Sequence, residues 1–133
     1  MNSAPETLDT FLDRVADGGG YTCPQQAARA TQHVLEVLGA HLVGDDRTDL
    51  ARLLPRHCGP LLSATEPATE PLPPESFVAA VAERGDDSVA EARRAVTAVL
   101  PVLAELADDA LLRRILTQLP PGHAGLFGRT EPA

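Results

Sequence analysis

The sequence predicts an all-α protein, a helical bundle made of two tandem three-helix repeats related by pseudo-two-fold symmetry. Three observations support this fold class. Apolar residues make up 44% of the 133 residues but aromatic residues only 3%, so the core must come mainly from Leu, Val and Ala, and Leu and Ala favour helix. The apolar residues recur with the helical period instead of alternating as in a strand. This pattern also occurs twice along the chain.

The duplication becomes visible when the two halves of the chain are aligned. Phe11 matches Phe77 at an offset of 66 residues (77 − 11), and Leu54 matches Leu119 at an offset of 65 (119 − 54). The first half therefore carries one extra residue in the segment DGGGYTC, a loop where an insertion costs little. Each half is too small for high stability on its own, so we expect the two to share one core.

These halves are expected to form a single domain over residues 1–133. The segment SATEPATEPLPPES between them is dominated by Pro and Thr-Glu pairs, which is typical of an extended linker. The predicted parts are repeat one at 6–62, a Pro-rich linker at 63–74, repeat two at 75–128 and a short tail at 129–133.

The first helix of each half is predicted from an apolar stripe with helical spacing. In the first half the stripe runs from Leu8 to Ala16, and the segment DGGG ends the helix. In the second half the stripe begins at Phe77, and Gly85 ends the helix.

The second helix of each half is longer. Pro24 suits its first position, after Cys23 or Thr22 as the N-cap, and Ser88 begins a capping box in the second half. Pro101 lies inside the later of these helices, where a proline costs about 3 kcal/mol. Because Pro101 falls opposite the apolar arc, we expect a kink that solvent accommodates, with a functional hinge as the alternative.

The third helix of each half is short and ends at a proline. Asp46 and Asp108 are the expected N-caps, and Pro55 and Pro120 are the expected stops. A turn then leads to an apolar pair that we expect to fold back as a lid, Leu61-Leu62 in the first half and Leu126-Phe127 in the second.

Both copies together resemble a known family. The segments FLDRVAD, AARATQHVLEVLGAHL and LARLLP, and in the second half FVAAVAE, SVAEARRAVTAVLPVLAEL and ILTQLP, resemble the bacterial domain-of-unknown-function family 2267. The resemblance covers nearly the whole chain outside the linker and tails. It implies an all-helical fold, and it implies no activity, cofactor or catalytic residue. The chain departs from the family pattern at Cys23, at the glycines 18–20 and at Pro101.

Charge and targeting signals narrow the classes of partner. The net charge is −8, from 11 basic residues, all of them Arg, against 19 acidic ones. A chain with this charge repels nucleic-acid phosphates and anionic membranes, so we expect neither as a partner.

We see no signal peptide and no apolar run long enough to span a bilayer. Two cysteines make no disulfide framework, and the predicted location is the cytoplasm.

Two basic pairs stand out in this acidic chain, at positions 93–94 and 113–114. We expect them to form salt bridges with neighbouring carboxylates, and a phosphate site is the alternative.

Four residues are the candidates for metal or ligand chemistry: His41, His57, Cys58 and His123. His41 falls inside the apolar arc of its helix, and we expect its ring to bond a carbonyl at the helix end. The alternative is a ligand or a catalytic base. If the two lids meet, His57, Cys58 and His123 would form a reasonable zinc set; otherwise they are turn residues exposed to water.

No nucleophile and base are arranged for catalysis, so we expect no catalytic residue and no cofactor. Whether the protein is an enzyme stays open, although the sequence favours a protein without enzymatic activity. The leading hypothesis is a non-catalytic protein-interaction module that presents a groove or its acidic surface to a protein partner. The alternative is a small-ligand or metal-binding protein that uses the lid histidines. The oligomeric state stays open.

Overall fold

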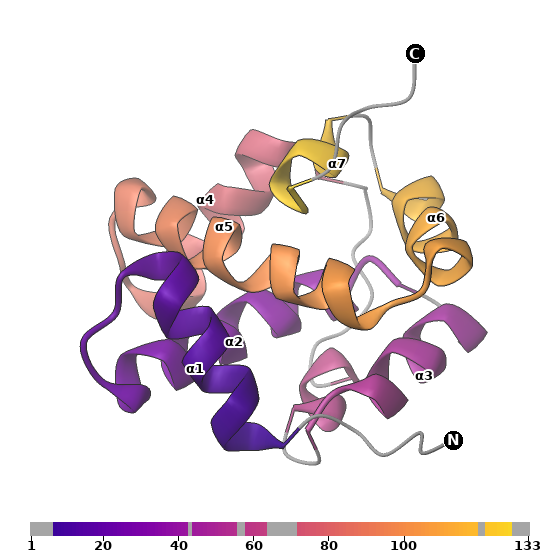
Figure 1. Cartoon of the computed structure of the whole chain (residues 1–133). Coiled ribbons are helices and arrows are strands. Elements are labelled where there is room, and N and C mark those ends of the chain that lie inside the picture. The colour runs from indigo at the N-terminus through magenta and orange to yellow at the C-terminus, as the bar shows by residue number, and fades with distance from the viewer. Residues whose placement is uncertain (1–6, 43, 56–57, 64–71, 120–121, 129–133) are drawn as a thin grey trace.

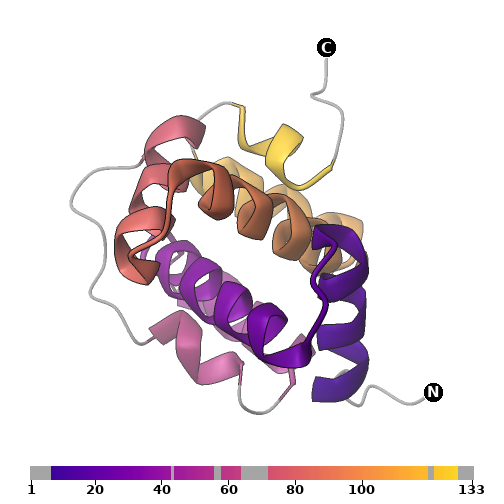
Figure 2. The same cartoon turned by 90° about the vertical axis from the view of Figure 1, so that its left-hand side faces the viewer.

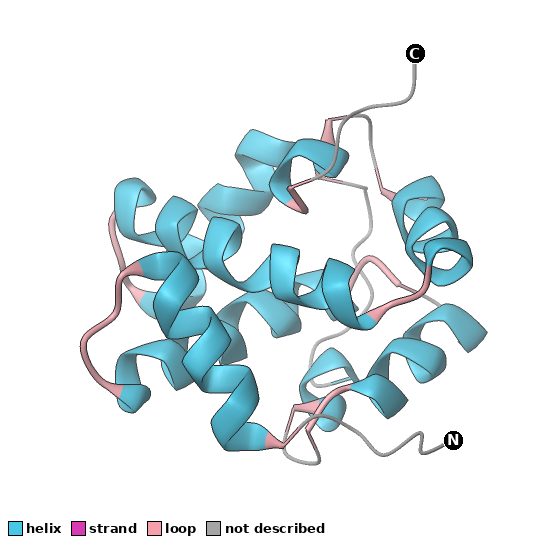
Figure 3. Cartoon of the chain, in the orientation of Figure 1, coloured by secondary structure: helices cyan, strands magenta, loops and turns pink. Residues whose placement is uncertain are grey.

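The computed structural model describes residues 7–42, 44–55, 58–63, 72–119 and 122–128. Every regular element in these ranges is a helix and none is a strand (Figures 1 and 3). The prediction of an all-α protein is therefore confirmed. In chain order the elements are α1 (Leu8–Gly19), α2 (Pro24–Gly39), α3 (Gly44–Leu53), the 3-10 turn η1 (Gly59–Ser63), α4 (Pro74–Gly85), α5 (Val89–Leu106), α6 (Asp109–Gln118) and α7 (His123–Leu126).

The order of elements in the first half recurs in the second. The starts of α1 and α4 differ by 66 residues (74 − 8). The starts of α2 and α5, and those of α3 and α6, differ by 65 (89 − 24 and 109 − 44). These are the two offsets found by aligning the sequence. The halves differ in their last element, which is a 3-10 turn in the first half and a single α-helical turn in the second.

Local capping chemistry sets several helix ends. The side chains of Ser88 and Asp108 each accept a hydrogen bond from the backbone N–H three residues later, at 3.1 and 2.7 Å, as predicted. Cys23 is the N-cap of α2 but makes no capping hydrogen bond. The prediction of Asp46 as a cap is wrong, because α3 already begins at Gly44. The Asp46 carboxylate still lies in the first turn, near the positive end of the helix dipole.

α5 continues through Pro101 without interruption. The proline is half-buried rather than fully open to solvent. A Cβ atom placed on Gly128, just after α7, would lie 3.6 Å from the proline ring, so the end of α7 covers part of this face. Whether Pro101 acts as a hinge stays a prediction.

The core lies between the two long helices and the first helix of each half. α2 and α5 run side by side, with α1 and α4 packed on either side (Figure 2). Equivalent phenylalanines, Phe11 and Phe77, are completely buried in one hydrophobic cluster that draws on both halves. Each such side chain contributes about 1.5–3 kcal/mol by its burial. α3 and α6 pack against each other at one end of the molecule (right in Figure 1).

Contacts between the halves are reciprocal. Arg29 donates to the carbonyl of Gly85, and the equivalent Arg94 donates to the carbonyl of the equivalent Gly19. In a two-fold interface, a contact from i to j is matched by one from the equivalent of i to the equivalent of j. These contacts support the predicted pseudo-two-fold relation, which itself stays a prediction.

One pair joins equivalent positions directly. Arg114 Nη2 lies 3.2 Å from Asp49 Oδ2, and the two positions are 65 residues apart. A residue that meets its own equivalent is expected beside a two-fold axis. The domain boundaries at 6–62, 63–74, 75–128 and 129–133 also stay predictions.

A close approach of two backbones fixes η1 on α2. A Cβ atom placed on Gly39 would lie 1.9 Å from the carbonyl oxygen of Leu62 and 2.5 Å from its Cα. Only glycine permits this packing, because real Cβ atoms do not approach backbone so closely. The equivalent position in the second half is Ala104, where the closing turn α7 packs on α5 instead.

Candidate functional site

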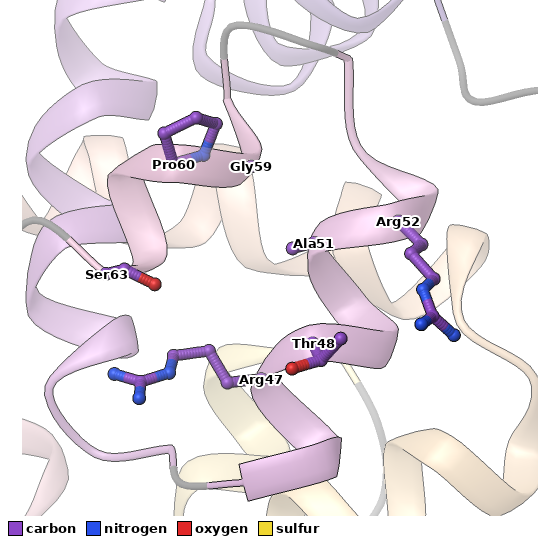
Figure 4. Close-up of a pocket in the computed structure, with 7 residues that line it drawn as sticks. All are labelled: Arg47, Thr48, Ala51, Arg52, Gly59, Pro60 and Ser63. Carbon is purple, nitrogen blue, oxygen red and sulfur yellow. The ribbon is translucent and has the colours of Figure 1, made fainter.

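The candidate site is a pocket between α3 and η1, with a volume of about 460 Å³. Figure 4 shows the residues that line it. Four of them come from one side of α3 and three from η1: Arg47, Thr48, Ala51 and Arg52, and Gly59, Pro60 and Ser63. Positions 47, 48, 51 and 52 share a face because their spacing follows the helical repeat.

The turn after α3 holds η1 beside that helix. The backbone N–H groups of Cys58 and Gly59 both donate to the carbonyl of Pro55, at 2.8 and 3.3 Å. A Cβ atom on Gly59 would lie 3.2 Å from the carbonyl oxygen of Ala51, so a small residue is needed where the two elements meet. Leu62 is completely buried and anchors the far end of η1 in the core. The η1 side of the pocket is therefore held in place by contacts of the packed fold.

Two arginines line the pocket, but in Figure 4 only Arg47 extends toward η1, whereas the Arg52 side chain extends to the other side of α3. Among the described residues, no carboxylate lies within ion-pair distance of Arg47. Arg52 has only a loose partner, because its Nη1 lies 3.7 Å from Asp49 Oδ1 and its side chain is 76% exposed. Asp49 is also engaged by Arg114 at 3.2 Å. The pocket therefore holds weakly compensated positive charge in a chain of net charge −8.

The pocket offers binding groups rather than catalytic ones. In Figure 4 the side chain of Arg47 extends from α3 toward the end of η1, where the Ser63 hydroxyl lies. Guanidinium groups recognise carboxylates and phosphates through paired N–H donors. Among the described residues that line the pocket, none is a His, Cys, Asp or Glu that could serve as a base or nucleophile. The arrangement suits reversible binding of an anionic group.

Sequence reasoning missed this pocket. The positions equivalent to Arg47 and Arg52 are Leu112 and Thr117, so the pocket is not part of the duplicated pattern. The only local signal was a pair of arginines on one face of a short helix, beside a Gly-Pro turn. Such a pair is common on solvated helices, and only the position of η1 makes it part of a pocket.

His41 is buried, with 9% of its surface exposed. Its Nδ1 lies 3.0 Å from the carbonyl oxygen of Val37, so the predicted bond to a helix-end carbonyl is confirmed. Its Nε2 accepts a hydrogen bond from the backbone N–H of Leu72 at 3.1 Å. Both ring nitrogens are therefore engaged within the fold. A ligand or catalytic role for His41 stays a prediction.

His123 is more deeply buried, with 1% of its surface exposed. Its Nε2 lies 2.8 Å from the carbonyl oxygen of Leu72. Its Nδ1 is buried and has no hydrogen-bond partner among the described residues. Burial lowers the pKa of His123, the bond to Leu72 opposes this shift, and the nearby His41 adds to it. The expectation of a water-exposed turn residue is therefore wrong for His123, because the turn carrying it packs against the core.

Cys58 is also buried, with 3% of its surface exposed. Burial raises the pKa of the thiol to about 11, so the thiolate needed for metal binding is disfavoured at neutral pH. His57 lies outside the described residues, so the proposed set of His57, Cys58 and His123 stays a prediction. Within the described part of the chain, no group of three His, Cys, Asp or Glu residues is placed to hold a metal ion.

The salt bridges expected of the basic pairs are found for three of the four arginines. Arg93 donates to both carboxylate oxygens of Glu75, at 2.8 and 3.2 Å, and these bonds lower the pKa of Glu75. Arg94 and Arg114 each pair with carboxylates as well. Arg113 is exposed on α6.

Of the described helices, none is both long and apolar enough to cross a membrane. The search of curated proteins finds no match to this chain. A family model described as an uncharacterized conserved protein, DUF2267, matches residues 8–126. The matched stretch begins with α1 and ends with α7, so it contains all of the helical elements. The chain therefore belongs to the DUF2267 family.

Proposed function

We propose that this protein is a non-catalytic protein-interaction module whose pocket between α3 and η1 receives an acidic segment of a partner protein. One observation carries the proposal. Arg47 has no carboxylate partner among the described residues, and Arg52 has only a loose one, although the chain as a whole is strongly acidic. The charge of the pocket is thus complementary to a carboxylate supplied from outside.

Charge also argues for a short acidic segment over a long polyanion. A nucleic acid would extend beyond the pocket over a chain whose net charge of −8 repels phosphates. A peptide needs to place only one or two carboxylates against the guanidinium groups. The volume of about 460 Å³ lies in the range typical of ligand pockets and accommodates side chains of that size.

The expected affinity is modest. Hydrogen bonds to charged groups contribute about 1.5–3 kcal/mol each, but exposed ion pairs are weakened by solvent and salt. We therefore expect dissociation constants of roughly 10–1000 μM at low salt.

The test is fluorescence anisotropy with a fluorescein-labelled hexaglutamate peptide, titrated with the full chain. Wild-type protein should bind the peptide, and the double variant Arg47→Gln/Arg52→Gln should bind at least about tenfold more weakly. The matched control is Arg113→Gln, which removes one exposed positive charge from α6, outside the pocket. Circular dichroism should show the same helix content for all three proteins.

Equal binding by the wild type and the double variant would refute the proposal. So would an equal loss of binding in Arg113→Gln, since net charge alone would then explain the effect. A wild-type chain that binds only a hexalysine peptide would place the interaction on its acidic surface instead.

A further inference from the structure

Two buried histidines from distant parts of the chain hold the same backbone unit. His41 follows α2 and accepts the N–H of Leu72 at 3.1 Å, while His123 at the start of α7 bonds the carbonyl of Leu72 at 2.8 Å. Leu72 lies just before α4, and its half-buried side chain packs against the core. Both polar backbone groups of Leu72, which leads into α4, are therefore hydrogen-bonded to a histidine.

One aromatic ring positions both imidazoles. The Phe77 ring centroid lies 5.7 Å from that of His41 and 5.3 Å from that of His123, the latter edge-to-face. Phe77 is completely buried in α4. Its side chain therefore couples the two histidines to the helix whose entry they hold.

The two neutral rings carry their protons on opposite nitrogens. The bond of His41 requires an unprotonated Nε2, whereas the bond of His123 requires only the proton on Nε2 and persists in the charged ring. His41 Nε2 accepts a hydrogen bond, so it carries no proton, and Nδ1–H donates to Val37. His123 must carry its proton on Nε2 to donate to the carbonyl of Leu72. Its unprotonated Nδ1 is then the buried atom without a partner.

Protonation of either ring opposes this arrangement. A proton on His41 Nε2 would face the N–H of Leu72, so an attractive contact would become a contact between two donors. A proton on His123 Nδ1 would create a buried donor without an acceptor. If both imidazoles that contact Leu72 were charged, they would also repel each other.

Four of the five carboxylates on α2, α4 and α5 are paired with arginine side chains. On α2, Glu36 accepts from Arg84 of α4 at 2.9 Å. On α4 itself, Glu75 is bound by Arg93 of α5. The remaining carboxylates of α5 and α4 near these helices are Glu83, Glu91 and Glu105, of which Glu91 pairs with Arg94 and Glu105 with Arg14. Among charged groups, the one that shifts the titration of His123 is His41.

We propose that His41 and His123 form a proton-operated clamp, which holds the segment entering α4 at neutral pH and loosens when His41 Nε2 or the buried Nδ1 of His123 takes up a proton. The depressed pKa of His123 agrees with this direction. A histidine with a lowered folded-state pKa contributes stability above its unfolded pKa, and that stability is lost as the pH falls through the folded pKa.

NMR can test the clamp directly at the Leu72 amide and at the two imidazole rings. Hydrogen exchange of the Leu72 amide and the imidazole Cε1–H shifts are measured in the full-length wild type from pH 8.0 to 5.5. After correction for intrinsic exchange, the protection of Leu72 should fall by about tenfold or more across the titration of the rings. In the double variant His41→Gln/His123→Gln, the glutamines offer an acceptor for the Leu72 N–H and a donor for its carbonyl, but neither side chain titrates. This variant should lose most of that pH dependence.

His33→Gln is the matched control, because His33 lies beside Gly85 at the opposite end of α4. It should retain the wild-type dependence of Leu72 protection on pH. Constant protection of Leu72 in the wild type, while either ring titrates, would overturn the proposal. Unchanged pH dependence in His41→Gln/His123→Gln would overturn it as well, and the wild-type measurement decides the question even if that variant fails to fold.

Discussion

The two closing segments, η1 in the first half and α7 in the second, start from matching sequence but do different work. η1 packs against both α2 and α3 and borders the arginine-lined pocket. α7 packs against α5, and its first residue, His123, reaches the backbone of Leu72. A duplicated helical framework therefore leaves its closing turns free to diverge, because they contribute few residues to the common core.

Equivalent positions show the same divergence at the level of single side chains. Cys58 and His123 are 65 residues apart in the sequence and are both buried. One is a thiol whose pKa is raised to about 11 by burial, and the other is an imidazole with a nitrogen that has no hydrogen-bond partner in the described part of the chain. The two equivalent positions are therefore both buried but carry different functional groups.

Substitution of Gly39 should give the largest difference between the halves. In Gly39→Ala the new methyl group would overlap the backbone of Leu62, which cannot move without displacing η1. We expect a loss of about 3 kcal/mol in the free energy of unfolding, as for severe overpacking. Urea denaturation followed by circular dichroism measures it.

The control for this variant is Gly18→Ala, also near the end of a helix. Its Cβ would lie at an ordinary distance of 3.6 Å from Ala98. Because alanine favours helix, stability should stay the same or rise by up to about 1 kcal/mol. Equal effects of the two substitutions would show that the close approach of η1 to α2 does not restrict position 39 to glycine.

Truncation of Phe77 and of its equivalent Phe11 tests whether the histidine contacts of Phe77 distinguish the two halves. Phe77→Leu removes a ring that contacts two histidines, whereas Phe11→Leu removes an equally buried ring for which no such ring contact is found among the described residues. Phe77→Leu should therefore cost about 0.5–1.5 kcal/mol more in the free energy of unfolding. Urea denaturation at pH 7.5 measures both variants, and a larger cost for Phe11→Leu would contradict the role given to Phe77.

The smallest effect is expected where the halves meet at equivalent positions. Asp49 and Arg114 form an ion pair with side chains that are 35% and 49% exposed. A double-mutant cycle with Asp49→Ala and Arg114→Ala should give a coupling energy of about 0.5 kcal/mol, reduced by salt. A coupling that persists undiminished at 1 M NaCl would show that the pair is shielded from solvent, contrary to its exposure.

Local interactions explain why the helices could be predicted from sequence. Apolar residues at helical spacing marked the buried faces, and the caps at Ser88 and Asp108 act over three residues. The bond from His41 to Val37 spans four residues, so it too could be predicted. Asp46 failed as a cap because several polar residues precede the apolar stripe of α3, and any of them can begin the helix.

The sequence by itself determined the all-α class, the repeated order of helices and most of their ends, because these depend on contacts within one or two helical turns. Only the tertiary structure decided that Arg47 and Arg52 border a pocket, and that His41 and His123 meet at Leu72, 31 and 51 residues away. Such contacts depend on how helices are placed against one another. The local sequence pattern indicates whether a residue is buried or exposed. It does not indicate which residues it contacts, because the same buried or exposed position suits many different neighbours.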